Sequence, residues 1–238
     1  MDSLAQELIN EIINNVPRKD MHATSLVAKR WRRPSQQRNF EFVLFESDSV
    51  TRWEVNIPQD PLGIPSHVRH VRFKHLPSLK PGTLSRVLGA FASMTSLDLE
   101  NSRLPPPEEL TVPVSLGKFG QRITRLTLVL VGESIRVIPS FILSFPNLKE
   151  LVFANVHFRP DESPSIVPEI ERRSLLESFV VLGSVEFTYN IIALWKVAPR
   201  RLSLGLCANG MDLIIRNASK TVVELTLTDM QLLQDCDK

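Results

Sequence analysis

Apolar side chains recur at helical spacing within the first forty residues of the chain. Counted from Leu8, the apolar positions up to residue 16 fall at i, i+1, i+4, i+5 and i+8, which places them in one stripe along an α-helix. Two further short helices are predicted up to residue 33. A segment this short cannot bury such a stripe alone, because domains below about 40 residues usually need a disulfide, a metal ion or a partner. Cysteine first occurs at residue 207, so a disulfide is excluded and we infer that another polypeptide covers the stripe.

From residue 67 onwards a second pattern, apolar-x-x-apolar-x-apolar, occurs six times, and a poorer version, Leu202-x-Leu204-x-Leu206, stands before the last of them. One apolar position in each unit, the anchor, stands at residues 71, 97, 126, 151, 179, 202 and 225, at intervals of 23 to 29 residues. Alternation of apolar and polar residues around each anchor predicts a strand. Helical segments are predicted between the strands, at 84–91, 137–145, 166–173, 189–196 and 211–219.

A strand followed by a helix at this interval cannot close a core within one unit, so neighbouring units must stack. The expected fold is an α/β solenoid with a parallel sheet on its concave side and helices on its convex side. The interval lies in the range of leucine-rich repeats. The alternative is a compact α/β domain in which the intervals match by chance, and the number of recurrences favours the solenoid.

The start of the chain resembles an F-box, and three consecutive segments carry the resemblance. They read Leu4-Ala5-Gln6-Glu7-Leu8 with Ile12-Ile13, then Pro17-Arg18-Lys19-Asp20-Met21, and finally Ser25-Leu26-Val27-Ala28-Lys29-Arg30-Trp31-Arg32. One departure is Ala5, which stands where the family usually has a proline that stiffens the start of the first helix. The resemblance implies docking to the Skp-type adaptor of a cullin–RING ubiquitin ligase, with the remainder of the chain selecting a substrate protein.

The repeats resemble leucine-rich repeats in a degenerate form. That family usually has an asparagine or cysteine five residues after the anchor, where it bonds the backbone of the turn. Here these positions hold Ser102, Val131, Val156, Ser184 and Met230, while polar residues stand one position earlier at Asn101, Asn155 and Asp229. An F-box followed by irregular leucine-rich repeats is similar to the F-box proteins found in fungi. The expected organisation is an all-α F-box at 1–46, a proline-rich connection at 47–66, and about seven degenerate leucine-rich repeats at 67–238.

Composition and charge exclude several classes of partner. The chain carries 28 basic and 26 acidic residues, a net charge of +2, which requires neither a nucleic acid nor an anionic membrane. Its two cysteines, Cys207 and Cys236, make no disulfide framework. The N-terminus lacks the features of a signal peptide, and the apolar runs are far shorter than the roughly 20 residues that span a bilayer. We expect a cytoplasmic or nuclear protein.

No catalytic or metal-binding constellation stands out along the chain. His67, His70 and His75 are close in sequence, but His67 and His75 would lie about 27 Å apart on one strand and could not meet at one ion. Cys207 is interpreted as a small apolar filler. The basic run 29–33 is interpreted as the solvated face of the third helix with Trp31 turned inward, a nucleic-acid contact or import signal being the alternative. The F-box resemblance likewise implies a non-catalytic adaptor without a cofactor.

Two candidate surfaces follow from these patterns. Adaptor binding is assigned to Leu4, Leu8, Ile9, Ile12, Ile13, Val16, Leu26, Val27 and Trp31, some of which must pack internally, Trp31 first among them. Residues that alternate with the anchors point out of the concave face. Among these, substrate binding is assigned to charged residues on two neighbouring strands and to apolar residues near the middle, namely His70, Arg72, Lys74, Asp98, Glu100, Val129, Val152, Val180 and Leu182. The charges can instead neutralise one another across the strands.

Two functions from different classes are consistent with these patterns. The first is the substrate-recognition subunit of an SCF-type cullin–RING E3 ubiquitin ligase. The second is a leucine-rich-repeat scaffold outside any ligase, in which the N-terminal helices cap the first repeat. A cap buries its apolar stripe, whereas a docking module exposes it. A hydrolase in an unrecognised α/β fold is a third candidate, against which the missing catalytic motif counts.

Overall fold

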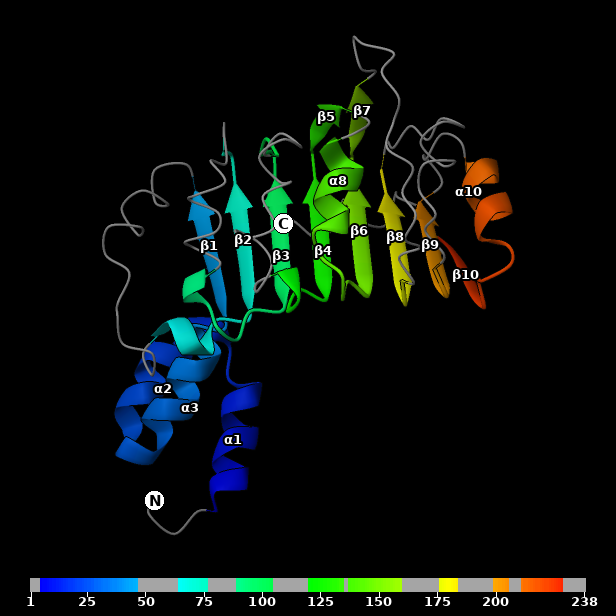
Figure 1. Ribbon diagram of the computed structural model, residues 1–238. Coiled ribbons are helices and arrows are strands. Elements are labelled where there is room, and N and C mark those ends of the chain that lie inside the picture. The colour runs from blue at the N-terminus through cyan, green and yellow to red at the C-terminus, as the bar shows by residue number, and fades with distance from the viewer. Residues whose placement is uncertain are drawn as a thin grey trace.

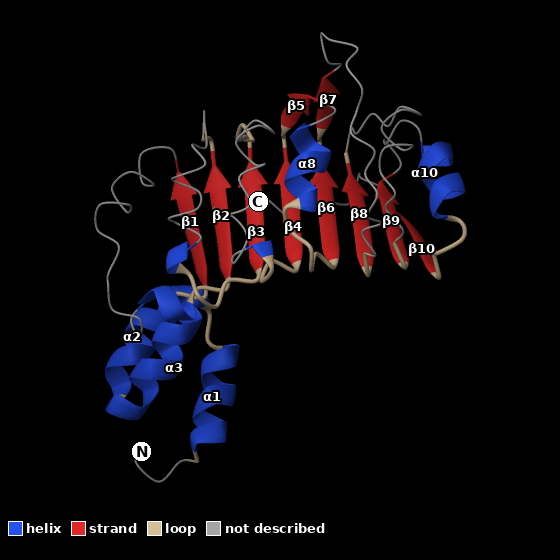
Figure 2. Cartoon of the chain, in the orientation of Figure 1, coloured by secondary structure: helices blue, strands red, loops and turns tan. Residues whose placement is uncertain are grey.

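The computed structural model of the chain describes residues 5–46, 64–76, 89–104, 120–134, 137–159, 176–183, 199–205 and 211–228. A small helical module at the N-terminus is followed by a long parallel sheet with helices against one face (Figure 1). The module lies at one end of the sheet, near the ends at which the strands β1 (Phe42–Glu46) and β2 (His70–Lys74) start. Figure 2 shows how the helices of the module are separated from the strands that follow.

The helical module consists of α1 (Gln6–Asn15), the 3₁₀ helix η1 (Arg18–Asp20), α2 (Met21–Val27) and α3 (Lys29–Asn39). Extended residues separate these helices. Val16 (φ −75°, ψ 132°) ends α1, as expected of a residue that precedes a proline. Ala28 (φ −158°, ψ 159°) ends α2 and starts α3. The module therefore turns the chain sharply at positions that the sequence marks.

The module has a hydrophobic core of its own. Ile9 and Ile13 of α1, Met21 of α2 and Trp31 of α3 form this core, and it is separate from the core of the sheet. Two units that each close a core are expected to be distinct structural bodies. The helices of the module thus form their core among themselves, whereas a solenoid cap is expected to complete its core against the first repeat.

Within the described residues, the sheet has eight parallel strands in the order β1-β2-β3-β4-β6-β8-β9-β10. After β1 and β2 these are β3 (Ser96–Glu100), β4 (Arg125–Val129), β6 (Glu150–Ala154), β8 (Ser178–Leu182), β9 (Arg201–Gly205) and β10 (Glu224–Thr228). The short strands β5 (Gly132–Ser134) and β7 (His157–Arg159) form a separate parallel pair. Helical elements of this part are η2 (Ile64–His67), α8 (Val137–Leu143) and α10 (Met211–Ala218).

All seven predicted strands are present, and their anchors lie in one register. The anchors of neighbouring strands are direct partners along the sheet, from Val71 on β2 to Leu225 on β10. From β2 to β9 the anchors are at most 3 % exposed, and so are the apolar residues two positions after them. This alternation confirms the parallel-strand solenoid. The predicted helices at 137–145 and 211–219 correspond to α8 and α10, whereas those at 166–173 and 189–196, and most of the one at 84–91, lie outside the described residues.

An eighth strand, β1, precedes the first predicted repeat. It pairs in parallel with β2, and Phe45 stacks on Phe73 with ring centroids 5.4 Å apart. Phe45 is buried in the core of the sheet. The last five residues of the segment expected as an F-box, 42–46, therefore lie in the solenoid. This segment carries the repeat pattern too, at Phe40, Val43 and Phe45, and Val43 pairs with the anchor Val71.

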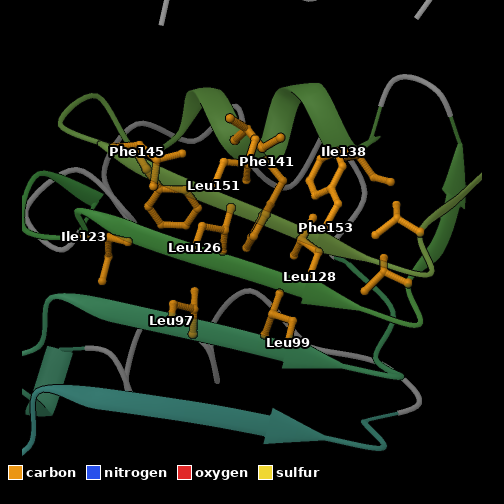
Figure 3. Packing of buried hydrophobic residues seen from close by; sticks show 14 of the residues in the cluster. Leu97, Leu99, Ile123, Leu126, Leu128, Ile138, Phe141, Phe145, Leu151 and Phe153 are labelled. Carbon is orange, nitrogen blue, oxygen red and sulfur yellow. The ribbon is translucent and has the colours of Figure 1, made fainter. Parts of the chain in front are cut away.

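The part of the solenoid core shown in Figure 3 lies between the sheet and α8. Ile138, Phe141 and Phe145 point from the α8 segment onto Leu126 and its neighbours in the sheet (Figure 3). The rings of Phe141 and Phe145 meet edge to face at 5.1 Å. The opposite face of the sheet, which carries the residues that alternate with the anchors, is called the open face below.

Each of five consecutive strands is followed by a residue in the left-handed backbone region. The residues are His75, Asn101, Leu130, Asn155 and Gly183, with φ between 45° and 70°. Asparagine and glycine adopt this conformation at low cost, which explains why the repeats carry polar residues one position before the family's usual asparagine. A side chain at Gly183 would also collide with the amide of Asn155. The turn, and not the buried asparagine, is what these repeats share.

Ser102 nevertheless fulfils the role of that asparagine in one repeat. Its buried hydroxyl accepts a hydrogen bond from the N–H of Leu76 (3.2 Å) and donates one to the carbonyl of Glu100 (2.9 Å). In the repeats that follow, Val131 and Val156 are buried at the equivalent position. The degenerate pattern thus replaces a polar turn contact with apolar packing.

Candidate protein-docking surfaces

The apolar side chains of the helical module divide into a buried and an exposed set. Ile9, Ile13 and Trp31 are buried in the core of the module. Four others are exposed to solvent, namely Leu8 (48 %), Ile12 (40 %), Leu26 (68 %) and Val27 (49 %). Val16 is half-buried against the module core, and Leu4 lies outside the described residues. The single stripe predicted from the sequence is therefore two adjacent stripes.

Helix geometry explains this division on α1. Residues 9 and 13 are one turn apart and face α3, whereas residues 8 and 12 are rotated by about 100° and face solvent. Some of the residues assigned to adaptor binding were expected to pack internally, Trp31 first among them. The structure places Ile9, Ile13 and Trp31 in the module core.

The basic run at the start of α3 lies around the buried Trp31. Lys29, Arg30, Arg32 and Arg33 are all exposed, while the Trp31 side chain packs against α1 and α2 residues in the module core. In α2, the helix before this run, the hydroxyl of Thr24 donates a hydrogen bond to the carbonyl of Asp20 at 2.8 Å. The run is therefore the solvated face of the third helix, as the sequence predicts.

On the open face of the sheet, the predicted basic and acidic strands neutralise each other. Both the Nε and an Nη of Arg72 donate to one carboxylate oxygen of Asp98, at 3.3 and 3.1 Å. Lys74 and Glu100 form an ion pair at 3.0 Å. His70 lies 3.9 Å from the carboxylate of Glu41. These charges have partners within the chain, so their presence is explained without a substrate.

A second group of charged side chains lies at the N-terminal ends of the strands β4, β6 and β8. Lys149 and Glu177 are 2.8 Å apart, and Arg125 and Glu150 are 3.8 Å apart. The hydrogen bond between the first two side chains, followed by their opposite charges, raises the pKa of Lys149 and lowers the pKa of Glu177. Both groups are solvent-exposed, and such pairs contribute little to stability.

Next to these two groups of charged side chains lies a contiguous apolar area on β4, β6 and β8. We call it the central patch, and it comprises Val129, Val152, Ala154, Val180 and Leu182. Val152 is the direct partner of Val180, while Ala154 is the direct partner of both Val129 and Leu182. All five are half-buried. Ala154 was not among the predicted residues, although it stands three positions after its anchor, as Val129 and Leu182 do.

Thr127 lies at the edge of the central patch, directly beside Val152 in the register. Its hydroxyl is buried and has no hydrogen-bond partner among the described residues. A buried hydroxyl without a partner is unfavourable, so this position would gain from a polar group of a bound molecule. The open face thus offers apolar contact with one polar point at its margin.

The described part of the chain contains no grouping of three or more histidine, cysteine, aspartate or glutamate side chains that could hold a metal ion. His75, one of the three neighbouring histidines, shares a hydrogen bond of 2.8 Å with the Asn101 amide across the turn. Cys207 lies outside the described residues. Among the helices that the structure describes, none has the length and apolar character needed to cross a bilayer.

Comparison with known families identifies the N-terminal module. Residues 1–33 match the sequence profile of the F-box domain, and a search of curated proteins found no match to the chain. F-box domains in general bind Skp1-type adaptors, and F-box proteins are in general non-catalytic substrate adaptors of SCF ubiquitin ligases. The matched residues cover α1, α2 and the start of α3, and leave out the sheet. The chain thus carries an F-box domain at residues 1–33, followed by a parallel-strand solenoid.

Proposed function

We propose that this protein is the substrate-recognition subunit of an SCF-type cullin–RING E3 ubiquitin ligase. The F-box module would dock to the Skp-type adaptor, and the open face of the solenoid would bind the substrate protein. The observation that carries the proposal is the exposure of Leu8, Ile12, Leu26 and Val27 on a module that already has a complete core. Leu4 and Val16 belong to the same proposed contact.

The energetics support an interface at these four side chains. Full burial of a leucine, isoleucine or valine side chain stabilises by about 1.5–3 kcal/mol, so covering side chains that are roughly half exposed would contribute about 1 kcal/mol each. Exposed apolar groups of this kind on a small module are typical of a docking surface. The scaffold alternative expects the opposite, because a solenoid cap would bury its stripe against the first repeat.

For the substrate side, the central patch supports the proposal better than the charged strands. Its five apolar residues are contiguous, whereas Arg72, Lys74 and their acidic partners satisfy each other. An apolar centre with a polar surround is the usual anatomy of a protein interface. We therefore expect the substrate to present an apolar segment, with a polar group that can reach Thr127.

The proposed mechanism is positioning and involves no chemistry by this chain. One body would hold the adaptor and the other the substrate, so that a substrate lysine stays near a ubiquitin-charged enzyme. Such tethering raises the effective concentration of the reacting groups without any new contact between them. The rate gained depends on how firmly the two bodies are joined.

The decisive experiment measures binding of the full chain to a purified Skp-type adaptor. Leu8→Asp with Ile12→Asp removes two exposed apolar side chains and places two carboxylates in the proposed interface, so we expect at least a ~100-fold loss of affinity. The matched control is Asn10→Asp with Asn14→Asp, which adds the same charge to the same helix at exposed positions and should leave the affinity within about threefold.

Circular dichroism must show that both double variants keep the helix content of the parent chain. Adaptor binding that survives Leu8→Asp with Ile12→Asp in a folded protein would refute the proposal. Equal loss in the control would mean that charge on α1, and not the apolar surface, governs binding.

A further inference from the structure

A pocket of about 350 Å³ lies at the joint between the F-box module and the solenoid. Its walls come from α1 and α3 on one side and from the segment of η2 and the start of β2 on the other. η2 lies directly against α3, as the position of the two elements in Figure 1 also shows. The volume is within the range of roughly 300–1,000 Å³ that is usual for small-molecule sites.

The lining of the pocket is polar and rich in hydrogen-bond donors. Arg38 of α3 and Arg69 before β2, which carry guanidinium groups, line the pocket together with Asn10 and Asn14 of α1, which carry amides. His67 at the end of η2 adds an imidazole. Arginine is the residue best suited to bind a phosphate group, because its planar donors match two phosphate oxygens.

The described residues do not neutralise the positive charge of the pocket. Among them Glu41 is the one acidic residue that lines it, and the Glu41 carboxylate lies beside His70 at 3.9 Å. Arg38 and Arg69 form no ion pair with any residue that the structure describes, and the Nε of Arg38 is buried without an acceptor there. A buried donor without an acceptor is costly unless a ligand supplies one.

The imidazole of His67 is also near a positive charge. Burial, followed by the charge of Arg33, lowers the pKa of the His67 imidazole. Among the described residues that line the pocket, the charged groups are Arg38, Arg69 and Glu41. An anion bound in the pocket would oppose the effect of Arg33 on the pKa of His67.

We propose that this pocket binds a small molecule through its phosphate group, which accepts hydrogen bonds from Arg38 and Arg69. A phosphate alone would not fill the volume, and the half-buried Pro34 gives the pocket an apolar contact for a compact body attached to it. Because the lining residues come from both structural bodies, the ligand would hold the F-box module and the solenoid together. The proposal does not depend on adaptor binding.

The test uses the full chain with inorganic phosphate, a hexose phosphate and the unphosphorylated hexose as probes in calorimetric titrations. Both phosphates should bind saturably and the free hexose should not. Arg38→Gln and Arg69→Gln should each weaken phosphate binding at least tenfold. Arg216→Gln, which removes an exposed arginine on α10 far along the sheet, should leave it unchanged.

Two further readouts separate a binding role from a structural one. The pKa of His67, followed by NMR, should rise on addition of phosphate, because a nearby anion stabilises the charged imidazole. Thermal unfolding should show that Arg38→Gln does not destabilise the chain, since it removes a buried donor without an acceptor. Absence of saturable phosphate binding, or binding that is insensitive to both arginine variants, would overturn the proposal.

Discussion

The open end of the sheet provides a matched pair of substitutions that tests the described packing. Leu126 and Leu225 are both anchors, on β4 and β10, and occupy the same place in the repeat and in the register. Leu126 is fully buried beneath α8, whereas Leu225 is 46 % exposed. The pair therefore compares one substitution, leucine to alanine, in two environments that differ in burial.

The expected costs follow from that difference. Leu126→Ala removes a fully buried side chain and leaves a cavity that the packed sheet cannot close, so it should destabilise by about 2–5 kcal/mol. Leu225→Ala removes a side chain that keeps roughly half of its contact with water and leaves no enclosed cavity, so it should cost about 1 kcal/mol. In a chain of this size, 1 kcal/mol corresponds to a shift of roughly 2–4 °C in the unfolding midpoint.

The assay is urea unfolding of each variant, followed by far-ultraviolet circular dichroism, with thermal midpoints measured in parallel. The variants should keep the m-value of the parent, so that a change in midpoint reports stability alone. Equal costs at the two positions would refute the reasoning, because they would mean that the face of Leu225 is covered in solution. A loss of less than about 1 kcal/mol in the free energy of unfolding for Leu126→Ala would contradict the burial of this anchor.

Three further predictions concern local features of the fold. Ser102→Ala should destabilise by about 1–2 kcal/mol in urea unfolding, because the buried N–H of Leu76 loses its acceptor, and a neutral outcome would show that water replaces the hydroxyl. The free energy of unfolding should fall as the pH drops below about 6.5, because the pKa of His67 is lower in the folded chain and the unfolded chain therefore binds the proton first. The variant His67→Gln should show a smaller difference in the free energy of unfolding between pH 7.5 and pH 5.5. Ala5→Pro should raise stability by about 0.4–1 kcal/mol, because Ala5 already has the φ of −61° that proline imposes, and a lower thermal midpoint would count against it.

Much of the solenoid could be predicted from the sequence because strand anchors alternate strictly. The seven anchors repeat a local rule, apolar side chains at alternate positions, and the parallel register follows once the units stack. The strand β1 has the same pattern, at Phe40, Val43 and Phe45, and Val43 precedes the anchor Val71 by 28 residues. It was not counted as a repeat because it lies within the segment assigned to the F-box.

The sites were less accessible to sequence reasoning than the fold. On α1 the positions 8, 9, 12 and 13 are all apolar, and only the placement of α3 decides which pair faces inward. From the sequence, Arg72 and Asp98 could either contact a substrate or pair with each other. In the structure an Nη of Arg72 lies 3.1 Å from the carboxylate of Asp98, so the two side chains pair. The pocket at the joint escaped notice because Arg38 and Arg69 belong to elements separated by some thirty residues.

The link between α3 and β1 consists of two residues, Phe40 and Glu41, and the carbonyl of Glu41 is fastened to the N–H groups of Arg69 and His70 at 2.9 Å. A rotation about so short a link would displace the far end of the sheet more than the near end. With strands about 4.8 Å apart, the eight-stranded sheet reaches roughly 34 Å from its first strand to its last, and a 10° swing at the hinge would displace the far strand by about 6 Å. Small changes in the backbone conformation of residues 38–41 would therefore cause larger displacements at the distal strands. A substrate bound near β8, as proposed, would be displaced less than one bound at β10.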